Sequence, residues 1–361
     1  MFERRLYFHV DWAMLGAMLA LCLLGLTQIY SATGGPTDTY FTQLYALGLG
    51  LVAMVVCLAV DYRSLTERSL LIYGGIVLLL VYVLFFGAVR GGSRRWIDLG
   101  AFNLQPSEFA KAALALVLAK FFSESRRDGV SRTDLLTAVA LTAVPVLLIG
   151  RQPDLGTAVT LLPVLFIVVF VAGMPMRVFA IIALAGLLVA PVAWQFVLED
   201  YQKERVVTFL DPEQDARGAG YQQIQARITV GSGGLWGKGF TRGTQGQLRF
   251  LPVAHNDFIF SVLAEEQGFA GVLVALGLYL FVIMRAIEAA RLSKDRLGSY
   301  LVLGVLASFS FQVVYNITMS AGLAPVKGLT LPLMSYGGSS LIATLAGFGL
   351  ILNVRMRRFT N

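Results

Sequence analysis

Polar residues gather in one segment of this otherwise apolar chain, and the segment ends in a carboxylate. Residues 199–257 hold 14 of the chain's charged side chains, of which 29 are basic and 22 acidic in total. The segment closes with His255-Asn256-Asp257, directly before a new apolar stretch. Folding alone does not require so long a hydrophilic block here. A carboxylate where a wet loop meets a membrane helix is well placed for chemistry on a lipid-linked substrate.

Asp257 is a candidate general base. Asp257, Ser261 and Glu265 are spaced i, i+4 and i+8, so on a helix they share one face beside an apolar flank. Apolar surroundings raise the pKa of a carboxyl group, which suits proton abstraction near neutral pH. The alternative is structural, because an acid at a helix start caps the helix and complements its dipole. Taken alone, the motif favours the structural role.

A second polar motif opens the apolar stretch at 106–122. Gln105 or Ser107 can cap this helix, and Pro106 is well tolerated at its start. Glu108 and Lys111 are three residues apart, so they share a helix face and can form an ion pair. Ionisable residues inside a membrane are costly and by default indicate function, which we favour here over the alternative of a purely structural ion pair.

Two further motifs flank that helix in sequence. Arg94, Arg95 and Trp96 can bind a diphosphate and stack on a sugar or acyl chain, or Trp96 can be an ordinary interfacial anchor. Asp154 follows Pro153 at the end of another apolar stretch. In isolation it is best interpreted as a helix cap, and the alternative is a carboxylate directed into a cavity, as a metal ligand.

The last motif interrupts an apolar region at residues 316–340. It contains Pro325, Lys327, Pro332 and paired glycines. Non-helical backbone at membrane depth is tolerated only where protein or a water-filled cavity satisfies its polar groups. The motif therefore predicts either the lining of a site or a re-entrant turn without a chemical role.

Composition places these motifs in a polytopic membrane protein. Hydrophobic residues make up 57% and charged residues 14%, with a mean hydropathy of +0.71, whereas a soluble domain carries about a quarter charged residues. We predict one all-α domain over 1–361, with about ten membrane-spanning helices and one large extracytoplasmic loop, 199–257, between helices seven and eight. The expected spans are 12–31, 41–60, 69–89, 106–122, 135–150, 156–173, 177–198, 259–284, 299–320 and 337–354.

The basic residues predict the orientation. With the N-terminus in the cytoplasm, inner loops hold 16 Lys and Arg and short outer loops hold five, while 199–257 holds seven and one lies within a span. This bias predicts that both termini are cytoplasmic. The net charge of +7 then follows from loops that face anionic lipid, and no nucleic-acid partner is needed. No glycine-rich nucleotide loop follows a strand, so we expect no ATP site and no organic cofactor.

Taken together, the motifs resemble the SEDS family of shape, elongation, division and sporulation proteins. The blocks that carry the resemblance lie in the family's order and span nearly the whole chain: RRWIDLG at 94–100, QPSEFAK at 105–111, RQPDLG at 151–156, HNDFIFSVLAEEQG at 255–268, and Asn316, Gly322, Leu323, Pro325, Gly328 and SYGGSS at 335–340. The sequences of the loops are most similar to those of the elongation branch, called RodA. Some relatives carry a basic residue where this chain has Asn103.

The resemblance implies a peptidoglycan glycosyltransferase of the bacterial inner membrane that polymerises lipid II during elongation. It implies a class B penicillin-binding protein as partner, beside other membrane proteins of the elongation complex. The family's essential loop aspartate corresponds to Asp257. The expected substrate-binding residues are Lys111, Glu108, Arg94, Arg95, Trp96, Gln105, Asp154 and Lys327. A divalent cation, Mg²⁺ or Mn²⁺, is expected as a possible aid to the diphosphate leaving group.

Two other classes of function fit parts of the pattern. A transporter that flips the lipid-linked precursor also suits intramembrane Glu108 and Lys111 and the interrupted segment near Pro325. A flippase, however, does not need an outer loop that bears a base. A scaffold for cell-wall assembly would leave Asp257 dispensable.

Overall fold

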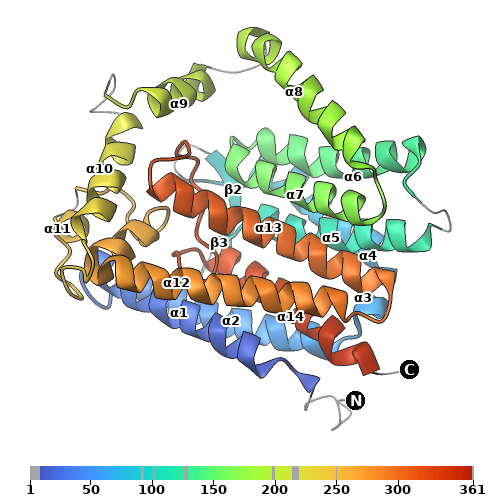
Figure 1. The fold of residues 1–361 in the computed structure, drawn as a ribbon, viewed down its shortest axis with the longest axis horizontal. Helices are drawn as coiled ribbons and strands as arrows, with labels where there is room; N and C mark the ends of the chain where they lie inside the picture. Colours follow the sequence, from blue (N-terminus) through green and yellow to red (C-terminus); the bar gives the residue numbers. More distant parts are fainter. Residues whose placement is uncertain are drawn as a thin grey trace.

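Long apolar helices run side by side and form one bundle in the computed structural model (Figure 1). The structure describes residues 9–90, 93–100, 103–125, 129–196, 200–213, 219–248 and 250–359. Arg4, Arg5, Arg126, Arg127 and Glu199, on which parts of the charge count and the loop boundary rest, lie outside these residues. Seven helices of the described residues are long and apolar enough to cross a membrane.

Each expected span coincides with a helix of the structure. The helices are α1 (Trp12–Thr33), α2 (Asp38–Ala59), α4 (Ser69–Phe86), α5 (Pro106–Glu124), α6 (Arg132–Gly150), α7 (Leu155–Val171), α8 (Met176–Phe196), α12 (Ile259–Arg291), α13 (Arg296–Ser320) and α14 (Gly338–Met356). Shorter pieces are α3 (Tyr62–Glu67), α9 (Asp200–Leu210), α10 (Ala219–Ser232), α11 (Thr244–Gln247) and η2 (Arg357–Phe359). The number of membrane crossings, and the side on which 199–257 lies, stay predictions.

Two helices form the centre of the bundle. Of the apolar stretch in α14, 83% is buried, and in α13 67%, against 17% in α4 and 22% in α2. Side chains of the outer helices are exposed where lipid would cover them, such as Leu71 at 76% and Leu78 at 71%. Apolar exposure of this kind is expected of helices whose solvent is hydrocarbon.

A small antiparallel sheet joins α4 to α5, which the all-helical prediction did not foresee. Its strands are β1 (Ala88–Arg90), β2 (Ser93–Asp98) and β3 (Asn103–Leu104), in the order β1-β2-β3. Trp96 pairs with Ala88, and Ile97 pairs with Leu104. Strand pairing satisfies the backbone of a connection that leaves one helix and enters the next.

Residues 321–337 connect α13 to α14 without forming a helix. Leu331, Leu333 and Met334 of this segment are 2% exposed or less, so the segment is packed inside the protein. Its turns include positive φ angles at Gly322 and Gly328, of 75° and 66°. The interruption predicted from the prolines is therefore confirmed, and its non-helical backbone is enclosed by protein.

The two ends of the bundle differ in character. The start of α1 and the end of α14 lie at one end, whereas α10 and α11 lie at the opposite end (Figure 1). Helix α10 contacts α12 and α13, and its Ala226 and Thr229 are buried, so this helix packs against the bundle.

An ion cluster lies at the end of the bundle where α1 begins and α14 ends. Asp11, whose side chain is 1% exposed, accepts two hydrogen bonds from Arg285, both 2.9 Å, and lies 2.8 Å from Arg355. Asp11 also caps α1 by accepting from the Met14 amide at 3.1 Å. One carboxylate thus joins α1, α12 and α14.

We expect Asp11→Ala to lower the free energy of unfolding by about 1–3 kcal/mol, because buried Arg355 would keep only its longer contact with Glu288, at 3.3 Å. Burial alone would raise the pKa of Asp11, but hydrogen bonds from Arg285 and Met14 and the charge of Arg355 outweigh it and lower the pKa below 3.8. The stabilisation is therefore full above pH 3.8 and is lost as the pH falls through the lowered pKa.

Thermal unfolding in detergent measures this effect. Exposed Asp38 in the first turn of α2 provides the matched control, for which removal of the carboxylate should cost less than about 1 kcal/mol. Equal stabilities of the two variants would contradict a role for the Asp11 cluster in holding the helices together.

Candidate active site

Most of the predicted site residues meet around one cavity of about 440 Å³. They come from parts of the chain that are far apart in sequence: β2, the start of α5, the start of α7, the turn before α12 and the interrupted segment 321–337. The predicted residues that line it are Arg95, Trp96, Gln105, Glu108, Asp154, Asp257 and Lys327. The fold therefore brings three carboxylates and two cations to the same space.

Asp257 lies in the turn that precedes α12. The helix begins at Ile259, and its cap position is held by Phe258, so Asp257 does not occupy the capping position of the structural alternative. The expected common face with Ser261 and Glu265 does not form at the cavity. Ser261 and Glu265 are fully buried, and Glu265 accepts from Lys238 at 2.6 Å and from the Thr244 amide at 2.9 Å. Non-helical backbone at Asp257 removes it from the helical spacing.

A buried asparagine fixes the backbone at Asp257. The Asn316 side chain on α13 is 0% exposed, and its amide donates to the Asp257 carbonyl at 2.8 Å and to the Leu329 carbonyl at 2.6 Å. The Tyr336 amide donates to the His255 carbonyl at 2.9 Å. These bonds hold the turn of residues 255–257 against the interrupted segment.

Asp154 caps α7, as expected, and also lines the cavity, while its role as a metal ligand stays a prediction. Its Oδ1 accepts from the Thr157 amide at 3.2 Å and caps α7, while Oδ2 accepts from Gln105 at 2.9 Å. The Arg95 guanidinium lies 3.4 Å from the same Oδ2. Asp154 is thus a cap and a wall of the cavity, and it holds Arg95 in place.

The two arginines of the RRW motif have different surroundings. Arg94 donates to the Phe85 carbonyl at the end of α4, at 3.2 Å, and it does not line the cavity. Arg95 and Trp96 do line it. Side chains that follow each other in a strand point to opposite faces, which a linear motif does not reveal.

The predicted Glu108–Lys111 pair forms. Lys111 Nζ lies 2.8 Å from Glu108 Oε2 and 2.9 Å from Gln312 Oε1 on α13. Glu108 lines the cavity, whereas Lys111 lies behind it, buried between α5 and α13. Direct contact between Lys111 and a substrate stays a prediction, and the geometry favours a positioning role.

Lys327 reaches the cavity from the interrupted segment. The carbonyl of Lys327 packs so closely on Gly156 of α7 that a Cβ there would lie 2.7 Å from it. The absence of a side chain at Gly156 therefore allows the segment with Lys327 to pack this closely against α7. A Cβ built on Gly328 would lie 3.7 Å from Asp257 Oδ2, so Lys327 and the candidate base flank the same turn.

Sequence reasoning missed a set of polar contacts that supports the cavity. Ser339 Oγ donates to the Asn103 carbonyl at 2.8 Å and accepts from the Gln105 amide at 2.9 Å. Gln43 on α2 donates to the Ser335 carbonyl and accepts from the Gly337 amide, at 3.1 and 3.0 Å. The SYGGSS block signalled the serines, but no motif singled out Gln43.

The side chains that line the cavity do not by themselves form a complete metal-binding site. Within the described residues, no group of three or more His, Cys, Asp or Glu is arranged to hold a metal ion. Asp154 and Glu108 are already paired with Arg95 and Lys111. A divalent cation fits this cavity only as a companion of a phosphate ligand, with few protein oxygens, which is the usual manner of Mg²⁺.

Comparison with known proteins places the chain in a family. Residues 5–359 match the model of the FtsW, RodA and SpoVE cell cycle proteins. The peptidoglycan glycosyltransferase MrdB of Escherichia coli K12 is 40% identical over 352 residues, which are 97% of this chain and 94% of that protein. The chain belongs to the FtsW/RodA/SpoVE family, which is the SEDS family that the motifs resemble.

Solved structures agree with this assignment. A chain from a study of how a peptidoglycan synthase complex coordinates polymerization and crosslinking superposes with a TM-score of 0.86 and 37% identity, covering 98% of this chain and 99% of that one. The rod shape determining protein RodA of Thermus thermophilus gives a TM-score of 0.73 and 34% identity, with 98% of both chains covered.

The structure predicts how the Glu108–Lys111 pair responds to substitution. Lys111→Met should destabilise the protein by about 3–5 kcal/mol, because Glu108 would remain buried and unpaired. Adding Glu108→Gln should restore most of the thermal stability in detergent and part of the enzymatic activity. A double variant that is stable but as inactive as the single one would instead assign Lys111 a direct role on substrate.

Proposed function

We propose that this protein is a peptidoglycan glycosyltransferase that polymerises lipid II into β-1,4-linked glycan strands during cell elongation. The observation that carries the proposal is the cavity itself, because Asp257, Arg95 and Lys327 all line the same space. An acidic side chain for the attacking hydroxyl and cations for a departing diphosphate are the two requirements of this transfer. The names of relatives at 40% and 32% identity support the same activity.

The chemistry is a single displacement with inversion. The 4-hydroxyl of the acceptor sugar attacks the anomeric carbon of the donor, the bond from that carbon to the diphosphate oxygen breaks, and the diphosphate leaves with the electron pair. The Asp257 carboxylate accepts the hydroxyl proton. Diphosphate leaves without protonation, so the second catalytic acid of sugar hydrolases is not needed.

Arg95 and Lys327 are the residues that we assign to the diphosphate. The Arg95 side chain is 27% exposed and already oriented by Asp154, so its planar donors are held before the substrate arrives. Lys327 lies beside the Asp257 turn, on the segment that Gly156 seats against α7. Preorganised cations stabilise charge that develops on the leaving group without reorganising during the reaction. Trp96 offers an apolar ring for a sugar face or the lipid.

A divalent cation, Mg²⁺ or Mn²⁺, is part of the proposal as a companion of the diphosphate. When bound, it would supply further positive charge to the leaving group. The carboxylates that line the cavity, Glu108, Asp154 and Asp257, would supply its few protein oxygens.

The chain is an integral membrane protein. We infer that it lies in the bacterial inner membrane with both termini in the cytoplasm, which places the cavity and residues 199–257 outside. The excess of Lys and Arg in the inner short loops supports this orientation. The start of α1 and the end of α14 also lie at the same end of the bundle.

A class B penicillin-binding protein is the partner that we propose, together with other membrane proteins of the elongation complex. A transpeptidase must work close to the polymerase because crosslinking consumes the new strand. The superposition with a chain from a peptidoglycan synthase complex supports a partner of this kind.

The direct test is polymerisation of lipid II by the purified chain in detergent, in the presence of moenomycin, which blocks a different type of polymerase. We expect a ladder of glycan products on a gel. Absence of product from folded protein, with or without co-purified penicillin-binding protein, would contradict the proposal. Movement of lipid II across vesicles without any polymer would favour the transporter class instead.

A further inference from the structure

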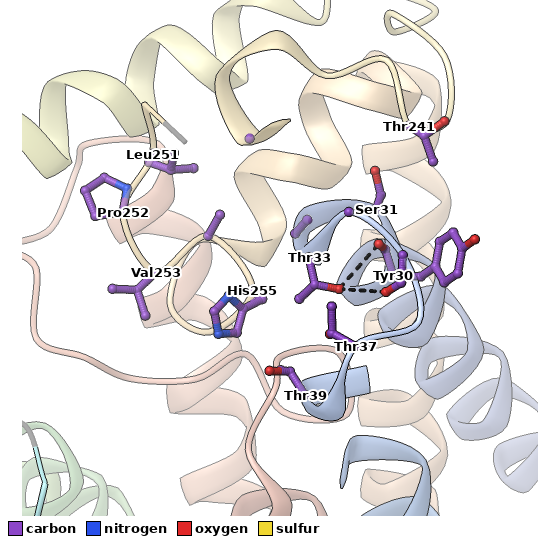
Figure 2. A pocket seen from close by; sticks show the side chains of 15 residues that line it. Tyr30, Ser31, Thr33, Thr37, Thr39, Thr241, Leu251, Pro252, Val253 and His255 are labelled. Carbon is purple, nitrogen blue, oxygen red and sulfur yellow. Dashed lines mark hydrogen bonds between the residues drawn. The ribbon is translucent and has the colours of Figure 1, made fainter. Parts of the chain in front are cut away.

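A second and larger cavity lies on the other side of the turn that carries Asp257. Its volume is about 860 Å³, and it is formed by the end of α1, the α1–α2 turn and residues 251–255. In Figure 2, His255 and Val253 lie on one side, and Thr33, Thr37 and Thr39 lie on the facing side. Nothing in the reaction described above uses this space.

The two cavities share a thin wall. His255 lines the larger cavity, whereas Asn256 and Asp257 line the candidate active site. On α2, Thr39 lines the first and Thr42 the second, and residues three apart share a helix face. The His255 ring contacts the Tyr336 ring of the active site edge to face, with centroids 5.6 Å apart. A ligand that fills the larger cavity therefore ends beside the base.

The lining suits an uncharged, hydroxyl-rich ligand. None of the described residues that line this cavity is Asp, Glu, Lys or Arg, whereas the active-site cavity holds cations. Burial lowers the pKa of His255 below 6.5, so its imidazole is neutral at pH 7. Hydroxyl groups come from Thr33, Thr39 and other lining residues. A diphosphate would find no cationic partner here, but sugar hydroxyls find donors and acceptors.

One lining hydroxyl is buried and unused. Thr37 occupies the cap position of α2, where threonine normally bonds the helix amides, yet its side chain makes no capping bond. Its Oγ1 is buried and has no hydrogen-bond partner among the described residues. A buried polar atom without a partner costs free energy, which a ligand hydroxyl would recover.

One tyrosine ring, that of Tyr30, lies at the edge of the same cavity, where it contacts two further rings. Tyr30, which lines it, stacks on Phe240 with ring centroids 6.3 Å apart and an interplanar angle of 17°. Tyr40 meets Tyr30 edge to face at 5.7 Å. Amphipathic rings offer an apolar face to a sugar ring and a hydroxyl to its substituents.

We propose that the cavity between the α1–α2 turn and residues 251–255 is the acceptor subsite, which binds uncharged sugar units of the acceptor glycan. This inference rests on the proposed function and deepens it. In the displacement, the acceptor oxygen must approach the anomeric carbon from the side opposite the diphosphate. The donor diphosphate would lie near Arg95 and Lys327, and the acceptor sugars would lie on the far side of His255. Asp257 then lies between donor and acceptor, where the hydroxyl proton is transferred.

A binding test that does not need activity uses a cysteine in the cavity. Thr39→Cys is labelled with a maleimide in detergent, with and without chitotetraose, a soluble β-1,4-linked N-acetylglucosamine oligomer. Cys22 is buried and Cys57 is half-buried near the other end of α2, so they contribute little labelling. We expect chitotetraose to slow labelling in proportion to occupancy, about tenfold at ten times its Kd, and maltotetraose to have no effect.

The matched control is Leu323→Cys, which replaces a residue that is 73% exposed and lies outside both cavities. If Thr39→Cys does not fold, Thr33→Cys takes its place. If chitotetraose does not slow labelling of Thr39→Cys, or slows labelling of Leu323→Cys equally, the subsite is overturned. The proposed polymerase activity is tested separately, by the lipid II assay. Protection in a protein that never polymerises lipid II would support a saccharide site and overturn the proposed reaction.

A kinetic test separates binding from chemistry. Thr37→Val keeps the side-chain shape and removes the unused hydroxyl, so the apparent KM for lipid II should rise about fivefold with kcat nearly unchanged, the cost of one hydrogen bond. Thr27→Val, on the exposed face of α1 outside the cavity, is the matched control and should leave both constants unchanged. An unchanged KM in Thr37→Val, or an equal rise in Thr27→Val, would contradict the subsite.

Discussion

The Asn316 side chain holds together the two segments on which the active site depends. Its amide, near the end of α13, donates to the backbone of Asp257 and of Leu329, so one residue fixes the turn with the base relative to the segment with Lys327. Neither segment is helical, and each exposes backbone groups that hydrocarbon cannot satisfy. The Tyr336–His255 backbone bond and the Gln43 contacts complete the same enclosure. The site's geometry follows from the need to pair these groups.

The two ends of the bundle have different roles. The ion cluster around Asp11 joins helices at one end, and the cavities lie at the other, where residues 251–257 run between them. Charge is separated in the same way. Arg95 and Lys327 face the smaller cavity, while the larger one is lined by neutral groups. A polymerase that joins a charged donor to an uncharged sugar needs this asymmetry, with the proton acceptor at the boundary.

Local patterns of the sequence predicted much of this, because they depend on nearby residues. Apolar runs located the helices, the i, i+3 spacing predicted the Glu108–Lys111 ion pair, and Asp154 caps α7 as expected. The features that local patterns do not reveal depend on tertiary placement. The sheet, the outward direction of Arg94, the position of Lys111 behind the cavity and the turning of Glu265 toward Lys238 are set by packing between distant segments. The larger cavity carries no sequence motif, since its threonines are ordinary residues until the fold brings them together.

The central claim is that Asp257 accepts the proton of the attacking hydroxyl, and Asp257→Asn tests it most directly. The amide keeps the size and polarity of the side chain but cannot act as the base, while the diphosphate contacts remain. Glycan product is measured on a gel beside lipid II binding to the same preparation. The account predicts turnover reduced about 10²–10⁴-fold with binding retained. Full polymerisation by the Asn variant would contradict it.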